Sequence, residues 1–200
     1  MGRPTVEAER RNQILAAACD VIAEIGFKSF RVVDVARRVG MSTGIIHYYF
    51  ETKRDLAQAA FEYNFDRSLA RRTPLLEEPQ GARERLHAFI GSYLPADDDT
   101  IKAWRVWAEL WVEALHDPDL QELNERVYGE WRRFVAAIIR DGQDAGEFIE
   151  SDPVLEANML IAMIDGLALQ ALLNSRSLTV ARMRQACDHH LRRLEAVATS

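Results

Sequence analysis

Apolar side chains recur at helical spacing in nearly every segment of the chain. In residues 6–26, for example, Ile14, Leu15, Ala18 and Ile22 fall on one face of a helix. No stretch alternates convincingly between apolar and polar residues, so the sequence predicts no strand. The pattern is typical of an all-α protein.

The same pattern, divided at glycine, proline and polar residues, predicts about nine helices. Four helices precede a connecting loop at residues 73–81, which contains two prolines and two glutamates. Five more follow the loop and form a larger helical body. The expected helices span residues 6–26, 32–39, 42–50, 56–72, 82–94, 100–116, 119–140, 154–173 and 180–197.

Three of the helix starts are marked by capping residues. Thr52 followed three positions later by Asp55 has the pattern of a capping box, in which each side chain accepts a backbone N–H at the helix start. Asp117 and Asp152 each precede a proline, which suits the first helical position because it has no N–H to satisfy. We therefore expect helices to begin just after these two aspartates.

Residues 32–50 have the pattern of a helix-turn-helix. Two short helices meet at Gly40, which permits a left-handed turn residue, and at Ser42, which can cap the second helix. On that second helix Ile46 and Phe50 are the expected core anchors. The remaining polar or amphipathic positions are Thr43, Gly44, His47, Tyr48 and Tyr49. These side chains either face an outside partner or pack against the first and fourth helices.

Charge is divided unevenly along the chain, whose net charge is −6. Residues 1–57 carry a net charge of +2 and residues 58–200 a net charge of −8. A small basic domain that binds nucleic acid, joined to a larger acidic domain, would have this division of charge, because binding to phosphates requires Lys and Arg.

Composition and motifs exclude several classes of protein. With 48% hydrophobic and 28% charged residues the chain is expected to be globular, and its only two cysteines, Cys19 and Cys187, are typical of a reduced protein in the cytoplasm. No secretory leader opens the chain, and the apolar stretch at residues 155–173 contains charged residues that indicate a buried helix, not a membrane span. Motifs of the common hydrolases, nucleotide-binding proteins and metal sites are not found, so we expect no enzyme activity, catalytic residue, metal or cofactor.

Short motifs in residues 14–56 carry a family resemblance. They are the I-x-x-A-A spacing from Ile14, the pair Gly26 and Phe27, the V-x-x-V-A run from Val32, the G-M-S turn, and an aromatic-aromatic-Phe ending followed by K-x-x-L from Lys53. In these features the segment resembles the N-terminal domain of the TetR family of bacterial transcriptional regulators. The resemblance implies a DNA-binding domain at residues 1–52 and an effector-binding and dimerisation domain at residues 53–200.

Carried over to this chain, the resemblance implies contacts with double-stranded DNA. It assigns phosphate contacts to Arg31, Tyr49 and Lys53. It assigns the reading of base edges to Thr43, Gly44, His47 and Tyr48. The chain departs from the family at Arg31, where Ser or Thr is usual as a cap for the helix that follows. Arginine cannot accept a backbone N–H, so it leaves that helix start without a side-chain cap.

The last two expected helices predict a dimer. Fourteen of the nineteen residues in 155–173 are apolar and fall all around the helix, so more than one face must be covered. Packing both helices against a second copy would form a four-helix interface, as in the family. The expected interface residues are Leu160, Met163, Ile164, Leu167, Val180, Met183, Cys187 and Leu191.

All four tryptophans lie in the body. Trp104, Trp107 and Trp111 are spaced i, i+3 and i+7 on one helix, and Trp131 follows on the next. They either fill the core or form a wall that binds a ligand. The motifs around these tryptophans, and the apolar run from Ile164, resemble the choline-responsive BetI-type branch of the TetR family. That resemblance implies a cationic effector, choline being one candidate, bound by Phe89, Tyr93, Trp104, Trp107, Glu109, Trp111, Tyr128, Trp131 and Asp165.

The sequence thus favours a homodimeric, ligand-responsive transcriptional repressor that binds a palindromic operator and is released by a small-molecule effector. The alternative is a helical dimeric module that binds a protein and has no sequence-specific affinity for DNA. Loss of salt-sensitive DNA binding on replacement of Tyr49 and Lys53 distinguishes the two.

Overall fold

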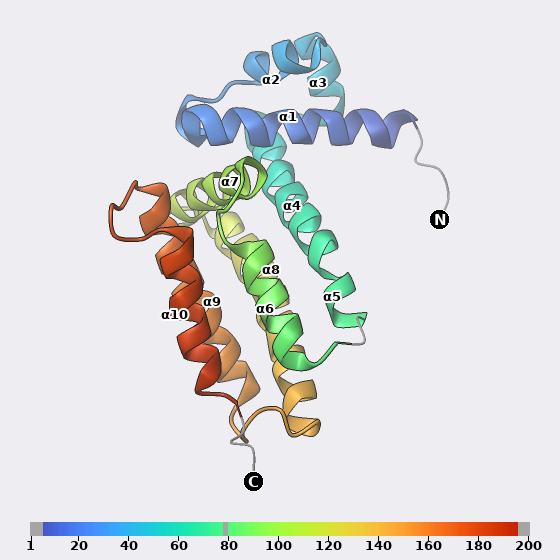
Figure 1. Cartoon of the computed structure of the whole chain (residues 1–200). Helices are drawn as coiled ribbons and strands as arrows, with labels where there is room; N and C mark the ends of the chain where they lie inside the picture. Colours follow the sequence, from blue (N-terminus) through green and yellow to red (C-terminus); the bar gives the residue numbers. More distant parts are fainter. Residues whose placement is uncertain (1–5, 78–79, 196–200) are drawn as a thin grey trace. The chain divides into compact units, whose positions relative to one another are not determined.

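The computed structural model describes residues 6–77 and 80–195, and this part of the chain is helical almost throughout (Figure 1). Its elements are α1 (Val6–Ser29), α2 (Val32–Val39), α3 (Thr43–Tyr49), α4 (Lys53–Arg72), α5 (Pro74–Glu77), α6 (Ala82–Tyr93), α7 (Asp98–Ala114), α8 (Pro118–Asp144), α9 (Pro153–Leu172) and α10 (Val180–Arg192). Within the described residues the one extended pairing is an isolated bridge between Phe148 and Glu195. The expected all-α class is confirmed.

The helix boundaries agree with the expected ones except at a few places. α1 continues past Gly26 to Ser29, with a kink at Gly26, whose φ and ψ are 78° and 159°. The expected loop at 73–81 contains one short helical segment, α5, which starts at Pro74. The last helix, expected to run to residue 197, ends earlier, at Arg192, because the chain turns at residues 193–194 and Glu195 pairs with Phe148.

Local capping fixes several of these helices as the sequence predicts. Thr52 N–H donates to Asp55 Oδ2 at 2.9 Å and Asp55 N–H donates to Thr52 Oγ1 at 3.1 Å, which completes the capping box ahead of α4. Asp152 Oδ1 accepts the N–H groups of Val154 and Leu155 at the start of α9. At the start of α8, Asp117 Oδ1 accepts the N–H groups of Asp119 and Leu120.

The chain forms two compact units. One holds the chain up to Ser68 together with Arg105–Asn124, and the other holds Leu69–Trp104 and the residues from Glu125 onward. Three helices, α4, α7 and α8, therefore contribute residues to both units.

The first unit is built on α1. α2 packs against α1 and α3 packs against α2, as Figure 1 shows. The core between them contains Ile14, Ile22, Phe30, Val35 and Ile46, all fully buried. α1 therefore supplies the base that holds the two short helices in place.

The second unit is built around α6, α9 and α10. α10 packs against both α6 and α9, and α9 and α10 lie side by side in Figure 1. The core side of α9 consists of Ala157, Leu160, Ile161, Ile164 and Ala168, each fully buried. By length and composition alone α9 could cross a membrane. Its buried side shows that it also serves as a core helix of this unit.

Candidate DNA-binding surface and effector site

The turn before α3 holds this helix as a helix-turn-helix requires. Gly40 ends α2 in the left-handed region, with φ 66° and ψ 30°. Ser42 then caps α3, because its hydroxyl accepts the N–H of Ile45 at 3.3 Å. Ile46 and Phe50 are buried, as the sequence predicts, and attach α3 to the core.

The opposite side of α3 is open to solvent. Thr43, Gly44, His47 and Tyr48 are all exposed, and 75% of Tyr48 is accessible. A side chain added at Gly44 would meet only the Ser42 hydroxyl, at 3.8 Å. The four residues expected to read base edges therefore share one accessible surface, which we call the α3 surface.

Two further residues of α3, Tyr49 and Ile45, are also partly accessible. Tyr49 is half-buried and contacts the Tyr48 ring edge-on, with 5.1 Å between the ring centroids. Ile45 was not among the expected contacts, yet it is 39% exposed beside Thr43. Its exposure follows from the packing of α3 on α2, which the sequence alone does not show.

The two expected phosphate-binding cations differ in their surroundings. Arg31 is exposed, makes no cap for α2, and its Nε lies 3.4 Å from Asp34 Oδ2. Lys53 is half-buried, and its Nζ donates to the Lys28 carbonyl at 3.2 Å. The same Nζ lies about 5 Å from the centroids of the Phe27 and Phe30 rings. The Lys28 carbonyl occupies one of the three N–H donors of this ammonium group, so a phosphate contact by Lys53 would use one of the other two.

Three residues expected at the effector site lie in the first unit instead. Trp107 is buried with its ring edge-on to Phe65, and Trp111 donates its indole N–H to Asn124 at 3.1 Å. Glu109 accepts the N–H of Phe27, just after the kink of α1, at 2.8 Å. These contacts show that Trp107, Glu109 and Trp111 hold together the unit that carries α3.

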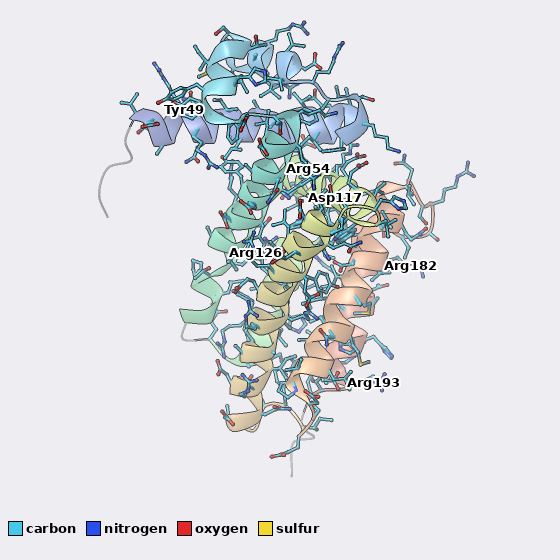
Figure 2. All side chains as sticks on the ribbon, turned by 180° about the vertical axis from the view of Figure 1, so that it is seen from behind. Tyr49, Arg54, Asp117, Arg126, Arg182 and Arg193 are labelled. Carbon is cyan, nitrogen blue, oxygen red and sulfur yellow. The ribbon has the colours of Figure 1, made fainter. Side chains whose placement is uncertain are left out.

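Another polar contact joins α4 to the start of α8 in the same unit. Arg54 Nη2 lies 2.7 Å from carboxylate oxygens of both Asp117 and Asp119. Figure 2 labels Arg54 and Asp117, which point toward each other, and Tyr49 on α3. No sequence pattern indicates this pair, because Arg54 and Asp117 are 63 positions apart in the chain.

The other expected effector residues gather in the second unit. Four of them pack as rings: the Tyr93 centroid lies 5.3 Å from that of Phe89, 5.1 Å from that of Trp104 and 5.3 Å from that of Trp131. Trp104 donates its indole N–H to the Tyr93 carbonyl at 2.7 Å. Phe134, which is not among the expected effector residues, lies against Phe89 and Trp131. We call Phe89, Tyr93, Trp104, Trp131 and Phe134 the aromatic cluster.

A buried carboxyl group lies in the same unit. Tyr128 donates its hydroxyl to Asp165 Oδ2 at 2.6 Å, whereas Asp165 Oδ1 is buried and has no hydrogen-bond partner in the described part of the chain. Burial raises the pKa of Asp165 to about 7, and the hydrogen bond from Tyr128 only partly offsets this. Burial, followed by the charge of Asp165, raises the pKa of Tyr93 well above its ordinary value. Asp165 thus acts electrostatically on the aromatic cluster.

The structure places most of the expected dimer residues inside one protomer. Leu160, Ile164, Met183, Cys187 and Leu191 are all buried to within 1%. These five side chains are core residues because α9 and α10 pack their apolar stripes on each other and on α6. Met163, Leu167 and Val180 are only half-buried. Of the eight expected interface residues, these three retain accessible surface in the protomer.

Both parts of the chain match known families. Residues 82–196 match the model of the C-terminal domain of BetI-type transcriptional repressors, and residues 14–60 match the model of the bacterial regulatory proteins of the tetR family. The transcriptional regulator BetI of Escherichia coli (strain K12) is 29% identical over 192 residues, which cover 93% of this chain and 94% of that protein.

Solved structures show the same relationship. A transcriptional regulator from Saccharomonospora viridis, crystallised in complex with choline, is 33% identical, with a TM-score of 0.86 over 92% of this chain and 96% of its own. A TetR-family regulator from Rhodococcus sp. is 28% identical, with a TM-score of 0.83 over 94% of this chain and 99% of its own. These families consist of transcriptional regulators, not enzymes. The chain, with its helix-turn-helix and helical C-terminal domain, belongs to the TetR family of bacterial transcriptional regulators and to its BetI-type branch.

Proposed function

We propose that this regulator is a homodimeric repressor in the cytoplasm, which binds a palindromic operator through the α3 surface and leaves it when a small cationic effector binds. The observation that carries the proposal is the α3 surface. Tyr48, Thr43 and His47 project from a capped, anchored helix and contribute little to the core. Side chains of these types can contact base edges and thymine methyl groups in the major groove.

Arg31 and Arg37 provide a matched test of the DNA contacts. Both side chains are 75% exposed and both pair with Asp34, but only Arg31 is proposed to contact phosphate. After an operator is selected from random duplexes, Arg31→Ala should weaken binding and reduce the dependence of log Kd on log salt by about one unit. Arg37→Ala should leave that slope unchanged. Equal slopes for the two variants would remove Arg31 from the interface, and failure to select any duplex would favour the protein-binding alternative.

A stripe on the exposed side of α9 supports the proposed dimer. Leu155, Met159, Leu169 and Leu173 are 36–66% exposed and recur at helical spacing, with the small Gly166 between them. Such a continuous apolar stripe is unusual on a monomer and fits a second copy related by a two-fold axis. Light scattering should show a dimer for the wild type and a monomer for Met159→Glu. The control is Val112→Glu, which places the same charge on an exposed apolar position of α7. A Met159→Glu protein that stays dimeric would place the interface elsewhere.

The aromatic cluster and Asp165 support a cationic effector. Ring faces attract cations, and a cation bound near Asp165 would favour the ionised form of this carboxyl group, whose pKa burial raises to about 7. The S. viridis relative, crystallised with choline, suggests the same class of ligand. Calorimetry with choline and its neutral isostere 3,3-dimethylbutan-1-ol tests the charge requirement. Choline should bind and release the operator, and stronger binding of the neutral compound would contradict the proposal.

A further inference from the structure

A cation of the protein itself already lies on the aromatic cluster. Arg72, the last residue of α4, is only 2% exposed. The carbon at the centre of its guanidinium lies 4.8 Å from the centroid of the Tyr93 ring and 5.3 Å from that of Trp131. These distances are within the range of a cation–π interaction.

Ser92 holds this guanidinium in place. Arg72 Nε donates to the Ser92 hydroxyl at 3.0 Å, and Arg72 Nη2 donates to the Ser92 carbonyl at 2.5 Å. The Ser92 hydroxyl in turn donates to the Phe89 carbonyl at 2.8 Å. Burial lowers the pKa of Arg72 to about 10, so the group remains charged at neutral pH. All of these residues belong to the second unit.

The burial of the rings determines what a ligand must do. Tyr93, Trp104 and Trp131 are 5%, 3% and 2% exposed, so their faces are covered in this structure. An external cation can reach the faces of Tyr93 and Trp131 only by displacing what covers them, and part of that cover is the positive charge of Arg72. A second cation beside Arg72 would also meet like-charge repulsion in a poorly solvated environment.

We propose that Arg72 is a tethered competitor of the effector, which occupies the aromatic cluster until an external cation displaces it. This inference rests on the proposed cationic effector and adds the event that binding triggers. Arg72 is the C-terminal residue of the helix that begins at Lys53, in the unit of α3. Displacement of Arg72 therefore acts on the last turn of α4. A ligand that binds only after Arg72 is displaced shifts the equilibrium toward the displaced form. The size of this shift is set by the difference between the ligand's affinities for the two forms.

Removal of the competing charge tests the inference. In Arg72→Gln the amide nitrogen takes about the position of Arg72 Nε, which donates to the Ser92 hydroxyl, but the side chain carries no charge. By calorimetry on the full-length protein, choline and tetramethylammonium should bind this variant at least about tenfold more tightly than they bind the wild type. Arg72→Lys, which keeps a cation at this position, should stay within about threefold of the wild type.

A neutral ligand separates charge from space. The affinity for 3,3-dimethylbutan-1-ol should differ little between Arg72→Gln and the wild type, because that compound does not compete as a cation. If Arg72→Gln raises the affinity for choline and for the neutral compound equally, the substitution has only enlarged the space at the cluster. That result would overturn the proposal. So would unchanged or weaker choline binding in Arg72→Gln, which is the expected result if Arg72 merely stabilises the fold or binds an anionic group of the effector.

Ser92→Ala provides a second variant in case Arg72→Gln folds poorly, which circular dichroism will show. It removes the hydroxyl that accepts from Arg72 Nε and keeps the arginine, so choline should bind a few fold more tightly. No gain in this variant would also count against the inference. Choline binding by the wild type with no gain in either variant overturns this inference alone. Choline binding by none of the proteins overturns the proposed effector class as well.

Discussion

The α3 surface and the aromatic cluster both present aromatic side chains, but in opposite states of burial. Tyr48 on α3 is 75% exposed, whereas Trp131 in the cluster is 2% exposed. The rings of the cluster contribute to the folding free energy whether or not a ligand binds, because they are removed from water in the free protein. Tyr48 contributes almost nothing to folding. Exposed aromatic residues therefore indicate a partner more directly than buried ones do.

The largest expected effect tests this contrast in stability. Trp131→Ala should lower the free energy of unfolding by about 3–5 kcal/mol, since it leaves a large cavity among Phe89, Tyr93 and Phe134. Tyr48→Ala should change it by less than about 0.5 kcal/mol. Urea unfolding followed by circular dichroism measures both. A similar loss in the two variants would mean that α3 depends on its exposed rings for stability.

The next prediction concerns the pH dependence of stability that Asp165 causes in the second unit. The pKa of Asp165 is about 7 in the folded protein and near 3.8 when unfolded, so between these values the folded state binds the proton and the unfolded state does not. The wild type therefore loses stability as pH rises through this window, while Asp165→Asn does not. Relative to the wild type, Asp165→Asn should gain about 4 kcal/mol between pH 4 and pH 8.

The same unfolding experiment at several pH values measures this gain. Asp98→Asn, at an exposed position in the first turn of α7, is the control and should follow the wild type. A difference between Asp165→Asn and the wild type that does not vary with pH would show that the carboxyl group ionises normally in the folded protein.

The smallest effect concerns the start of α3. Ser42→Ala removes the hydroxyl that accepts the Ile45 N–H and should lower the free energy of unfolding by about 1 kcal/mol. DNA affinity should fall as well, because the start of α3 becomes less well ordered. Thermal unfolding and fluorescence anisotropy with operator DNA measure the two effects. Ser42→Gly should retain most of the stability, and an equal loss in both variants would argue against capping as the cause.

The features that could be predicted from the sequence are those that depend on residues close together in the chain. The capping box at Thr52 and Asp55 and the Ser42 cap involve groups three positions apart, so their chemistry can be read directly from the chain. The exposure of Thr43, His47 and Tyr48 followed from the placement of Ile46 and Phe50 in the core. These local patterns also carried the family resemblance.

Contacts between segments far apart in the sequence could not be predicted from these local patterns. The spacing of Trp104, Trp107 and Trp111 predicted that the three rings share one stripe of a helix, either in the core or as a ligand-binding wall. In the structure α7 passes from one compact unit to the other, and of the three only Trp104 joins the aromatic cluster. Arg72 lies on the cluster because α4 brings it to Ser92, which the helical period of α4 alone does not indicate. Five of the eight expected dimer residues lie in the core of one protomer, because hydrophobicity alone does not distinguish a face that packs inside the protomer from one that packs on a second copy.

Gly44 has a consequence for the selection of more stable variants. Glycine within a helix is about 0.5–1 kcal/mol less favourable than alanine, and the space around Gly44 would admit a methyl group freely. Selection for heat resistance alone would therefore replace this glycine. If the backbone at Gly44 approaches DNA closely, the selected proteins would melt at higher temperature and bind their operator less well, and thermostability and regulation would evolve in opposite directions at this one residue.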